Sequence, residues 1–570
     1  MNNTARSEFP NPQFKREKWL CLNGEWDFEF DFGVSGKDSG MLQKNEWSKK
    51  INVPFCPESE LSGIGYKDFI PAVWYRKKVT LSEDDVKGSV FLCFGAVDYE
   101  SEVYVNGKLA GTHKGGYTSF KIDISDFVTP GENTIIVNAV DDTRSPIQPT
   151  GKQSIWYNSI GCHYTRTTGI WQSVWLEFTS ENYIESFKVF PDSVNACVSL
   201  SVNVKGTGTL NADVFYEGKK IGSMSKSGST CIFGEIHLSE THLWEPGNGR
   251  LYDIILSFCG DEVKSYFGLR NISLDGYKFL INGKSVFQRL VLDQGFYPDG
   301  IYTAPTAQAL EDDVILSMNV GFNGARLHQK VFEPLFLYYC DKHGYLVWGE
   351  YPNWTSDYSD PRLVDVITNE WVEAVERDFN HPSIIGWCPF NETWDYEGKR
   401  QRNELLETVY KITKAIDKTR PCIDTSGNFH TAFTDIYDTH DYEQDVIIFK
   451  ERYDEFKNGG KLYDKVNDGN SEYKGGPVFV SEYGGIKWSV GSEGESWGYG
   501  KSPDDEEEYI NRYKGLTDTL LDNDKMFGFC YTQLYDVEQE QNGVYTYRRK
   551  AKFPPEILKK INSRKAAIED

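Results

Sequence analysis

The chain has 570 residues, a length that predicts three or four domains, or fewer if one of them is a barrel. Its 61 Lys and Arg residues against 85 Asp and Glu residues give a net charge of −24. A charge this negative repels phosphate backbones and anionic lipids, so we expect neither nucleic acid nor a membrane surface as a partner.

The eleven cysteines are predicted to be reduced thiols. The two closest in sequence, Cys231 and Cys259, are 28 residues apart, and there is no Cys-x-x-Cys pair or Cys/His spacing typical of metal ligands. The first residues lack an apolar signal-peptide core, and no run of 18 apolar residues occurs. These features predict a soluble, cytoplasmic protein without a disulfide framework or structural zinc. No required metal or cofactor is expected either.

From about residue 20 to residue 268, short runs of alternating polarity are separated by turn signals, a pattern typical of β-structure. The pair Asn106-Gly107 lies between two such runs and predicts a hairpin, because both residues tolerate the positive φ that a type I′ turn needs. Further strands are expected at 120–124, 134–139 and 173–177. A second set is expected between 186 and 267, with a loop at 205–208. The stretch around Glu181 and Asn182 is the predicted junction between two β-sandwiches.

After Gly268 the pattern changes to strands alternating with helices. Pro305 is expected at the first turn of a helix, and Gly344 is expected to end a later helix. The expected strands are 287–292, 320–327, 345–350, 384–387, 422–425, 434–437, 477–480 and 527–531, and helices are expected at 333–343, 363–375, 405–416 and 509–520. This rhythm over some 300 residues predicts a (β/α)₈ barrel; a doubly wound sheet would usually carry a glycine-rich loop after its first strand.

Active sites of such barrels lie at the C-terminal ends of the strands, so polar residues that end apolar runs are the candidates. These residues are Arg326, His328, Glu350, Asn391, Glu392, Asp424, His440, Ser481, Glu482, Gln533 and Asp536. Glycoside hydrolysis needs one protonated and one ionised carboxyl group, which Glu392 and Glu482 would supply. Arg326 would keep Glu482 ionised.

Two motifs carry a resemblance to a known family. The run from His381 to Trp387 followed by Asn391-Glu392, and the tetrapeptide Ser481-Glu482-Tyr483-Gly484, resemble the acid/base and nucleophile strands of glycoside hydrolase family 2, within the 4/7 superfamily. Segments 22–26, 74–76, 103–107 and 169–174 are similar to its N-terminal sugar-binding domain, and 267–270 and 280–284 are similar to the start of its barrel. The resemblance implies a jelly-roll sandwich over 1–181, an immunoglobulin-like sandwich over 182–268 and a (β/α)₈ barrel over 269–570.

The resemblance also implies roles. Glu482 would be the nucleophile of a retaining double displacement, Glu392 the acid/base, and Asn391 a ligand of the sugar 2-hydroxyl. The other residues expected to bind substrate are Arg326, His328, His440, Tyr442, Asp293, Trp354, Trp394 and Trp488. For each tryptophan, core packing or loop anchoring is the competing interpretation.

The sequence departs from the family at several points. Residues 387–392 read Trp-Cys-Pro-Phe-Asn-Glu in place of Trp-Ser-Leu-Gly-Asn-Glu, and the first barrel strand lacks the Gly-x-Asn-x-His turn. Members that cleave β-glucuronides carry an Asn-Lys pair in the last barrel loop, whereas here Gly543 follows Asn542 and Glu540 would repel a uronate. Arg548 and Arg549 are two nearby arginines that could compensate.

We therefore expect an exo-acting glycosidase for a terminal neutral β-linked sugar, with β-galactoside first. A β-glucuronidase, β-mannosidase or arabinosidase is the alternative within the family. The rivals from other classes are a non-catalytic carbohydrate-binding protein with an inactive barrel and a metal-dependent lyase, which would need clustered His, Asp and Glu ligands. The expected partner is a glycoside or oligosaccharide substrate. The sequence leaves open whether the chain forms a homo-oligomer.

Overall fold

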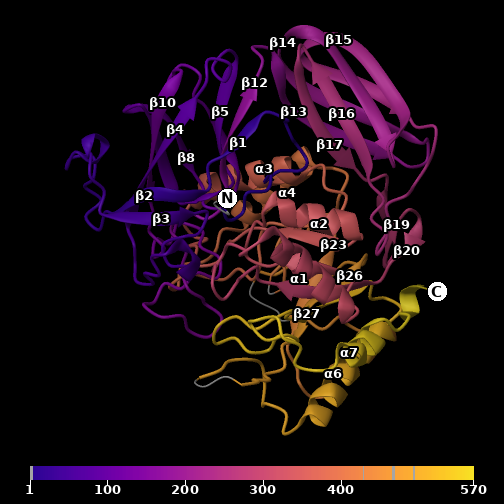
Figure 1. The fold of residues 1–570 in the computed structure, drawn as a ribbon. Coiled ribbons are helices and arrows are strands. Elements are labelled where there is room, and N and C mark those ends of the chain that lie inside the picture. The colour runs from indigo at the N-terminus through magenta and orange to yellow at the C-terminus, as the bar shows by residue number, and fades with distance from the viewer. Residues whose placement is uncertain (1–3, 428, 465–468, 492–494, 570) are drawn as a thin grey trace.

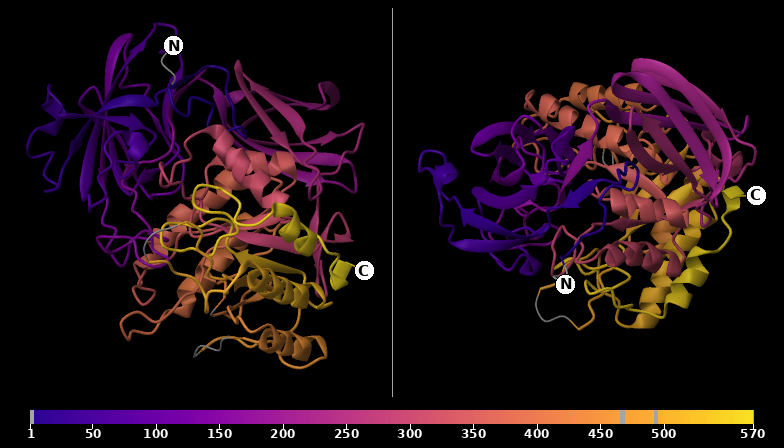
Figure 2. Two further views of the ribbon diagram at one scale, coloured as in Figure 1. Left: turned by 60° about the horizontal axis from the view of Figure 1, so that its bottom comes forward. Right: turned by 45° about the horizontal axis from the view of Figure 1, so that its top comes forward.

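The computed structural model describes residues 4–427, 429–464, 469–491 and 495–569. Two β-rich units lie next to each other on one side of an α/β unit, and the chain runs through the three in order (Figures 1 and 2). All eleven cysteines are free thiols. No helix in the described part of the chain is long and apolar enough to cross a membrane.

The first unit is a sandwich of two antiparallel sheets. One has the order β1-β12-β5-β9 and the other β3-β2-β4-β10-β7-β8, and β6 pairs with β11 beside them. The strands are β1 (Trp19–Cys21), β2 (Gly24–Phe30), β3 (Lys49–Val53), β4 (Ala72–Leu81), β5 (Ser89–Phe94), β6 (Val97–Asp98), β7 (Glu100–Val105), β8 (Lys108–Lys114), β9 (Phe120–Asp123), β10 (Gly131–Val140), β11 (Gly169–Ile170) and β12 (Val174–Thr179). Asn106 and Gly107 connect β7 to β8 with φ of 51° and 79°, so the predicted hairpin is confirmed.

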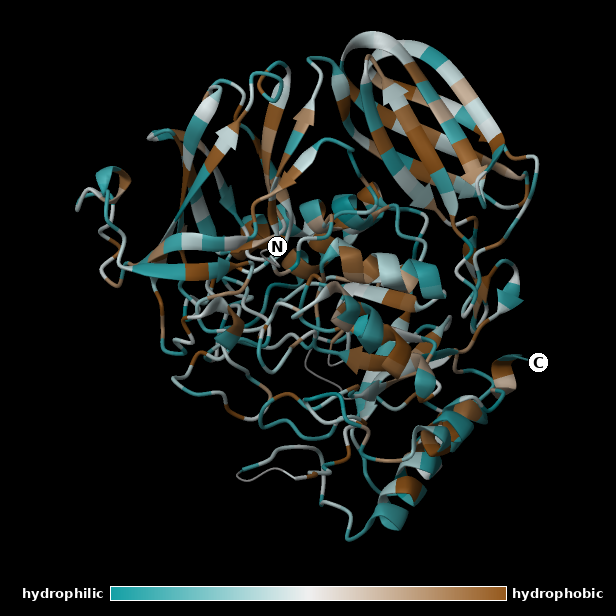
Figure 3. Cartoon of the chain, viewed as in Figure 1, coloured by the Kyte–Doolittle hydropathy of each residue, from teal (hydrophilic) through white to brown (hydrophobic). Residues whose placement is uncertain are grey.

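The second unit is built on β13 (Tyr183–Asp192), β14 (Cys197–Tyr216), β15 (Lys219–His237), β16 (Tyr252–Phe258) and β17 (Asp261–Phe267). Strand β14 pairs with β13 along its first half and with β16 along its second, while β15 follows it throughout. A register shift between Val204 and Thr207 lets the pair bend into two layers, and Gly206 there has a φ of 98°. The loop predicted at 205–208 is therefore wrong, because these residues lie inside β14. Apolar and polar residues alternate along these strands (Figure 3).

The third unit begins with a small sheet of β18 (Ile272–Asp275), β19 (Lys278–Ile281) and β20 (Lys284–Ser285). A parallel sheet of seven strands follows, with the order β24-β23-β22-β21-β27-β26-β25. These strands are β21 (Gln288–Asp293), β22 (Gly324–Leu327), β23 (Leu346–Glu350), β24 (Ile384–Cys388), β25 (Tyr437–Asp441), β26 (Val478–Gly484) and β27 (Gly528–Thr532). The sheet curls, and β21 pairs with β27, so the first and last strands are neighbours.

The eighth position is occupied by an irregular segment. Cys422 and Ser426 form isolated parallel bridges to Trp387 and Asn391 next to β24, so the strand predicted at 422–425 is wrong as a regular strand. On its other side there is no regular ladder: the Asp435 N–H donates to the Cys422 carbonyl at 3.0 Å, and the Cys422 N–H donates to the Asp435 side chain (Oδ2) at 2.9 Å. The strand predicted at 434–437 is displaced to β25, which begins at Tyr437.

The helices are α1 (Ala307–Asn319), α2 (Pro334–His343), α3 (Leu363–Asp378), α4 (Asn403–Ile416), α5 (Val446–Lys457), α6 (Glu506–Leu521) and α7 (Pro555–Asn562), with short 3₁₀ turns at Met41–Gln43, Glu60–Ser62 and Ala567–Glu569. Pro305 was expected at the start of α1, but it lies two residues before Ala307, because the N-cap of α1 is Thr306. Gly344 ends α2 with a φ of 67°, as predicted. Helices α5 and α7 were not predicted. The predicted α/β barrel is confirmed.

Helix α3 joins the barrel to the first sandwich through Glu370. Its Oε1 accepts the Tyr117 N–H of the sandwich at 2.6 Å, and its Oε2 accepts the Tyr351 hydroxyl at 2.7 Å. The side chain is buried, and burial raises the pKa of Glu370 to about 7. A carboxyl group is therefore kept protonated at an interface between two units.

This predicts a pH dependence of stability. Because the folded chain holds the Glu370 proton to about pH 7 whereas the unfolded chain releases it near 4.5, stability should fall between these values, by an amount of order 3 kcal/mol. Glu370→Gln carries no proton to lose. Its melting temperature should therefore rise relative to that of wild type as pH rises from 5 to 7.5. Glu376→Gln, at an exposed position of the same helix, is the control. Parallel melting profiles for wild type and Glu370→Gln would contradict the prediction.

Candidate active site

Two carboxylates face each other at the C-terminal end of the barrel. Glu482 lies within β26, and Glu392 follows β24 after Pro389, which has no N–H to continue the strand. The Glu392 N–H donates to the Ser426 carbonyl at 2.8 Å, and its φ of 47° turns the side chain out of the strand direction. One oxygen of each carboxylate lies within 4.8 Å of the other. This close approach is nearer to the about 5–5.5 Å between carboxyl groups that retaining enzymes have than to the about 6.5–9.5 Å of inverting ones.

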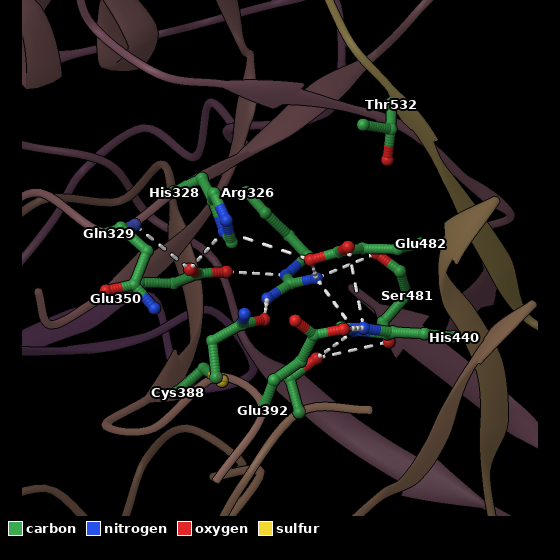
Figure 4. A network of polar contacts seen from close by, with 12 residues as sticks. Arg326, His328, Gln329, Glu350, Cys388, Glu392, His440, Ser481, Glu482 and Thr532 are labelled. Carbon is green, nitrogen blue, oxygen red and sulfur yellow. Dashed lines mark hydrogen bonds and ion pairs between the residues drawn. The ribbon is translucent and has the colours of Figure 1, made fainter. Parts of the chain in front are cut away.

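Arg326, at the end of β22, connects these groups (Figure 4). Its Nη1 donates to Glu482 Oε1 at 3.1 Å and its Nη2 to Asn391 Oδ1 at 2.8 Å, while Nε lies 2.5 Å from Glu350 Oε1. The guanidinium is buried, and burial opposes its charge, but the two carboxylates outweigh burial and raise its pKa. Arg326 is therefore a fixed positive charge next to the Glu482 carboxylate.

His440 of β25 lies between the two carboxylates. Its Nδ1 is 2.7 Å from Glu392 Oε1 and 3.5 Å from Glu482 Oε2, and its Nε2 is 3.0 Å from Ser426 Oγ. Burial lowers the pKa of His440, but Glu482 and Glu392 outweigh it, so the pKa is raised from its usual 6.5. The imidazole ring packs on Gly427, where a Cβ would lie 2.4 Å from Nδ1.

Tyr442 follows β25 and donates its hydroxyl hydrogen to Glu482 Oε2. The same hydroxyl lies 3.0 Å from Thr532 Oγ1, at the end of β27. Its ring stacks on Tyr499 with centroids 3.4 Å apart. Glu482 is thus held on one oxygen by Arg326 and on the other by Tyr442, an arrangement that fixes the carboxylate in one orientation.

His328 interacts with Glu350 rather than directly with the carboxylate pair. Its Nδ1 is 3.0 Å from Glu350 Oε2 and 3.9 Å from Glu482 Oε1. Burial lowers the pKa of His328 well below its usual value, so the ring stays neutral. Burial raises the pKa of Glu350, against the opposing effect of Arg326. Glu350 had been identified only as a strand end, and the structure places it under the site.

The three tryptophans predicted as subsite walls lie in different surroundings. Trp354 donates its Nε1–H to the Asn391 carbonyl at 3.0 Å, and the exposed Trp394 packs edge-on against it with centroids 5.7 Å apart. Trp488 instead packs on Tyr509 and Phe553, as expected of a loop anchor. The structure therefore brings Trp354 and Trp394, but not Trp488, next to the residues around Glu392.

Asp293, the last residue of β21, is also separate from the carboxylate pair. Its Oδ1 accepts the Tyr535 hydroxyl and the Gly295 N–H, the latter at 2.9 Å. Burial, with the charge of Asp313, raises the pKa of Asp293 to about 6. These bonds hold together the loops that follow β21 and β27, and the sugar contact of Asp293 stays a prediction.

Ser481, a strand-end candidate, and three residues that were not predicted complete the site. Ser481 Oγ and Ser426 Oγ lie 3.1 Å apart beneath His440, and Asp438 accepts hydrogen bonds from both. Lys152 reaches the barrel from the first sandwich and places its Nζ 4.1 Å from the centre of the Trp354 ring. Sequence rules for barrels inspect strand ends alone, so no signal marked a lysine in another unit.

The atoms of Glu392, His440 and Glu482 are close enough to hold a cation. However, Arg326 already places a positive charge 3.1 Å from Glu482, and His440 Nδ1 is within hydrogen-bond distance of Glu392. The charge of Arg326 would repel an additional metal ion, and His440 would compete with that ion for Glu392. Glu392, His440 and Glu482 therefore fit acid–base chemistry better than metal binding.

Comparison with known proteins agrees with this architecture. The sugar-binding domain of glycosyl hydrolases family 2 matches residues 21–180, and the TIM barrel domain of the same family matches residues 272–515. Together these matches cover more than half of the chain. The protein belongs to glycoside hydrolase family 2.

Individual relatives have different names. A β-galactosidase of Thermoanaerobacter pseudethanolicus is 26% identical over 62% of this chain and 48% of its own length. A β-glucuronidase of Felis catus is 24% identical over 84% of this chain and 79% of its own. The chain thus spans about half the length of that β-galactosidase. A solved β-glucuronidase structure from Ruminococcus gnavus, at 20% identity, superposes with a TM-score of 0.79 and covers 98% of this chain and 99% of its own, which shows the shared fold.

Proposed function

We propose that the chain is a retaining exo-glycosidase in which Glu482 is the nucleophile and Glu392 the acid/base. The observation that carries this proposal is the pair of carboxylate oxygens within 4.8 Å of each other, one of them held beside Arg326. Glu482, held next to the buried Arg326 guanidinium, would attack the anomeric carbon. Glu392, the more exposed of the two, would protonate the leaving oxygen and later activate water. The intact pair disfavours a purely carbohydrate-binding role.

Asn391 fits the proposed role at the sugar 2-hydroxyl. Its Oδ1 is occupied by Arg326, whereas its buried Nδ2 has no hydrogen-bond partner among the described residues. A buried donor without a partner costs about 1–3 kcal/mol, and a substrate hydroxyl would remove that cost. Arg326 therefore orients both the nucleophile and the 2-hydroxyl ligand. Trp354 and Trp394 remain our candidates for a subsite wall.

We also infer that the chain divides near residues 181 and 268. Three apolar clusters support this division: one lies within the first sandwich, one mainly within the second, and the largest spans the barrel and its contacts with the first sandwich.

For the sugar we propose a neutral β-linked glycoside, with β-galactoside first. Arg548 lies 3.5 Å from Asp299, and Arg549 forms an ion pair with Asp313 at 3.0 Å, so both arginines near this loop already have acidic partners. Asn542 is also occupied, since it accepts from Gln533 and donates to Glu540. The names of the relatives keep a β-glucuronide as the second candidate.

A panel of nitrophenyl glycosides tests the proposal. We expect β-galactoside or its pentose analogue α-L-arabinopyranoside to show a higher kcat/KM than β-glucuronide, measured as nitrophenol release by purified protein. The Glu482→Gln variant, prepared identically, reports contaminating host glycosidases. A kcat/KM for β-glucuronide more than tenfold above every neutral glycoside would overturn the choice of sugar.

A further inference from the structure

A loop of the first sandwich docks on the barrel next to the carboxylate pair. The Gly151 N–H donates to the Pro352 carbonyl at 3.2 Å. Gly151 has a φ of 58°, and a Cβ there would lie 2.5 Å from the Gln329 carbonyl oxygen, so only glycine permits this approach. The next residue, Lys152, is thereby directed toward Trp354, whose indole N–H is bonded to the Asn391 carbonyl.

Lys152 is a buried cation without a hydrogen-bonding partner. It is 5% exposed, and among the described residues its Nζ makes neither a hydrogen bond nor an ion pair; its only close polar contact is with the face of Trp354. Burial disfavours its charge, but the acidic groups of Cys162, Glu540 and Glu482 outweigh burial and raise its pKa. Its three ammonium donors are therefore unused by the described protein groups and can serve a ligand that supplies acceptors.

Glu540 is the complementary group on the barrel side. It is 2% exposed; one oxygen accepts the Tyr164 hydroxyl, and the other accepts Asn542 Nδ2 at 3.1 Å. Each oxygen can accept a further hydrogen bond. Tyr164 also ties the two residues together, because its N–H donates to the Lys152 carbonyl at 2.8 Å. Lys152 and Glu540 therefore come from different units and are held by one tyrosine.

We propose that Lys152 and Glu540 together bind hydroxyl groups of the glycone, so that the first sandwich supplies a specificity-determining residue to the barrel site. A sugar hydroxyl is both donor and acceptor, so it matches a lysine that only donates and a carboxylate that only accepts. The pair is balanced in charge and therefore fits a neutral sugar better than a uronate. This inference rests on the proposed function.

The test combines Lys152→Met with substrates that lack single hydroxyls. Wild type and variant are assayed on nitrophenyl β-galactoside and on its 3-, 4- and 6-deoxy analogues. We expect Lys152→Met to lower kcat/KM for the parent glycoside at least tenfold, and to lower it less than threefold for the one analogue that lacks the bound hydroxyl. If Lys152 acted only in folding, the variant would lower kcat/KM equally for all four substrates. Lys152→Arg, which keeps the charge, should recover part of the loss.

Lys77→Met is the matched control, because Lys77 also lies over a tryptophan of the first sandwich, 5.8 Å from the Trp26 ring, and its kinetics should be unchanged. Equal losses on all four substrates, or no loss, would overturn the inference. So would a Lys152→Met variant that loses β-glucuronide cleavage alone, since Lys152 would then be a carboxylate ligand. If wild type cleaves no neutral glycoside, that result contradicts the proposed sugar and is distinguishable from a failure of the Lys152 inference.

Discussion

Glu482→Gln should lose nearly all turnover, with kcat falling on the order of 10⁴-fold or more on every glycoside. The amide cannot form the glycosyl-enzyme, and the buried Arg326 would lose one of its two partner carboxylates. Initial rates with an activated nitrophenyl glycoside measure the effect. Glu451→Gln, at an exposed position of α5, controls for a general effect of removing a carboxylate and should keep full activity. Residual activity above a tenth of wild type would contradict the assignment.

Glu392→Gln should act selectively, according to the leaving group. Glycosides of acidic phenols need little protonation, so formation of the glycosyl-enzyme should be nearly unchanged for them, whereas alkyl glycosides should lose about 10²–10⁴-fold. Deglycosylation slows for all substrates, because no base activates water.

Added azide should restore turnover of the Glu392 variant and give a β-glycosyl azide, identified by NMR. The small anion replaces water in the second step and needs no general base. Equal losses on all leaving groups without rescue would contradict this role. An α-glycosyl azide from the same variant would instead make Glu392 the nucleophile.

The two glutamates and most of their neighbours could be located from the sequence because each ends an apolar strand. Parallel strands of a barrel all end at one rim, so Arg326, Asn391, His440 and Glu482 had to converge once the strands were recognised. The hairpin at Asn106 and the end of α2 at Gly344 were likewise predictable, because the residue types that adopt positive φ can be recognised in the sequence.

Other features depend on partners far away in sequence. Asp293 ends a strand as Glu482 does, yet Tyr535 binds its carboxylate, and no local pattern reveals that contact. Trp488 is likewise held by Tyr509 and Phe553. The segment at 422–426 has the apolar start of a strand, but side chains such as Asp435 satisfy its backbone.

The pairing of β21 with β27 determines when the site can form during synthesis. Gln288 lies opposite Gly528, so closure of the barrel requires two segments separated by 240 residues, whereas the first sandwich is complete by Thr179. Because long-range pairing is slow, a ribosome-bound chain carries folded sandwiches ahead of an open half-barrel. Glu392 emerges well before Glu482, and the barrel that holds both cannot close until its last strand, β27, leaves the exit tunnel. The nascent chain is therefore inactive for most of its synthesis, and its open sheet edges are the part that chaperones would have to protect.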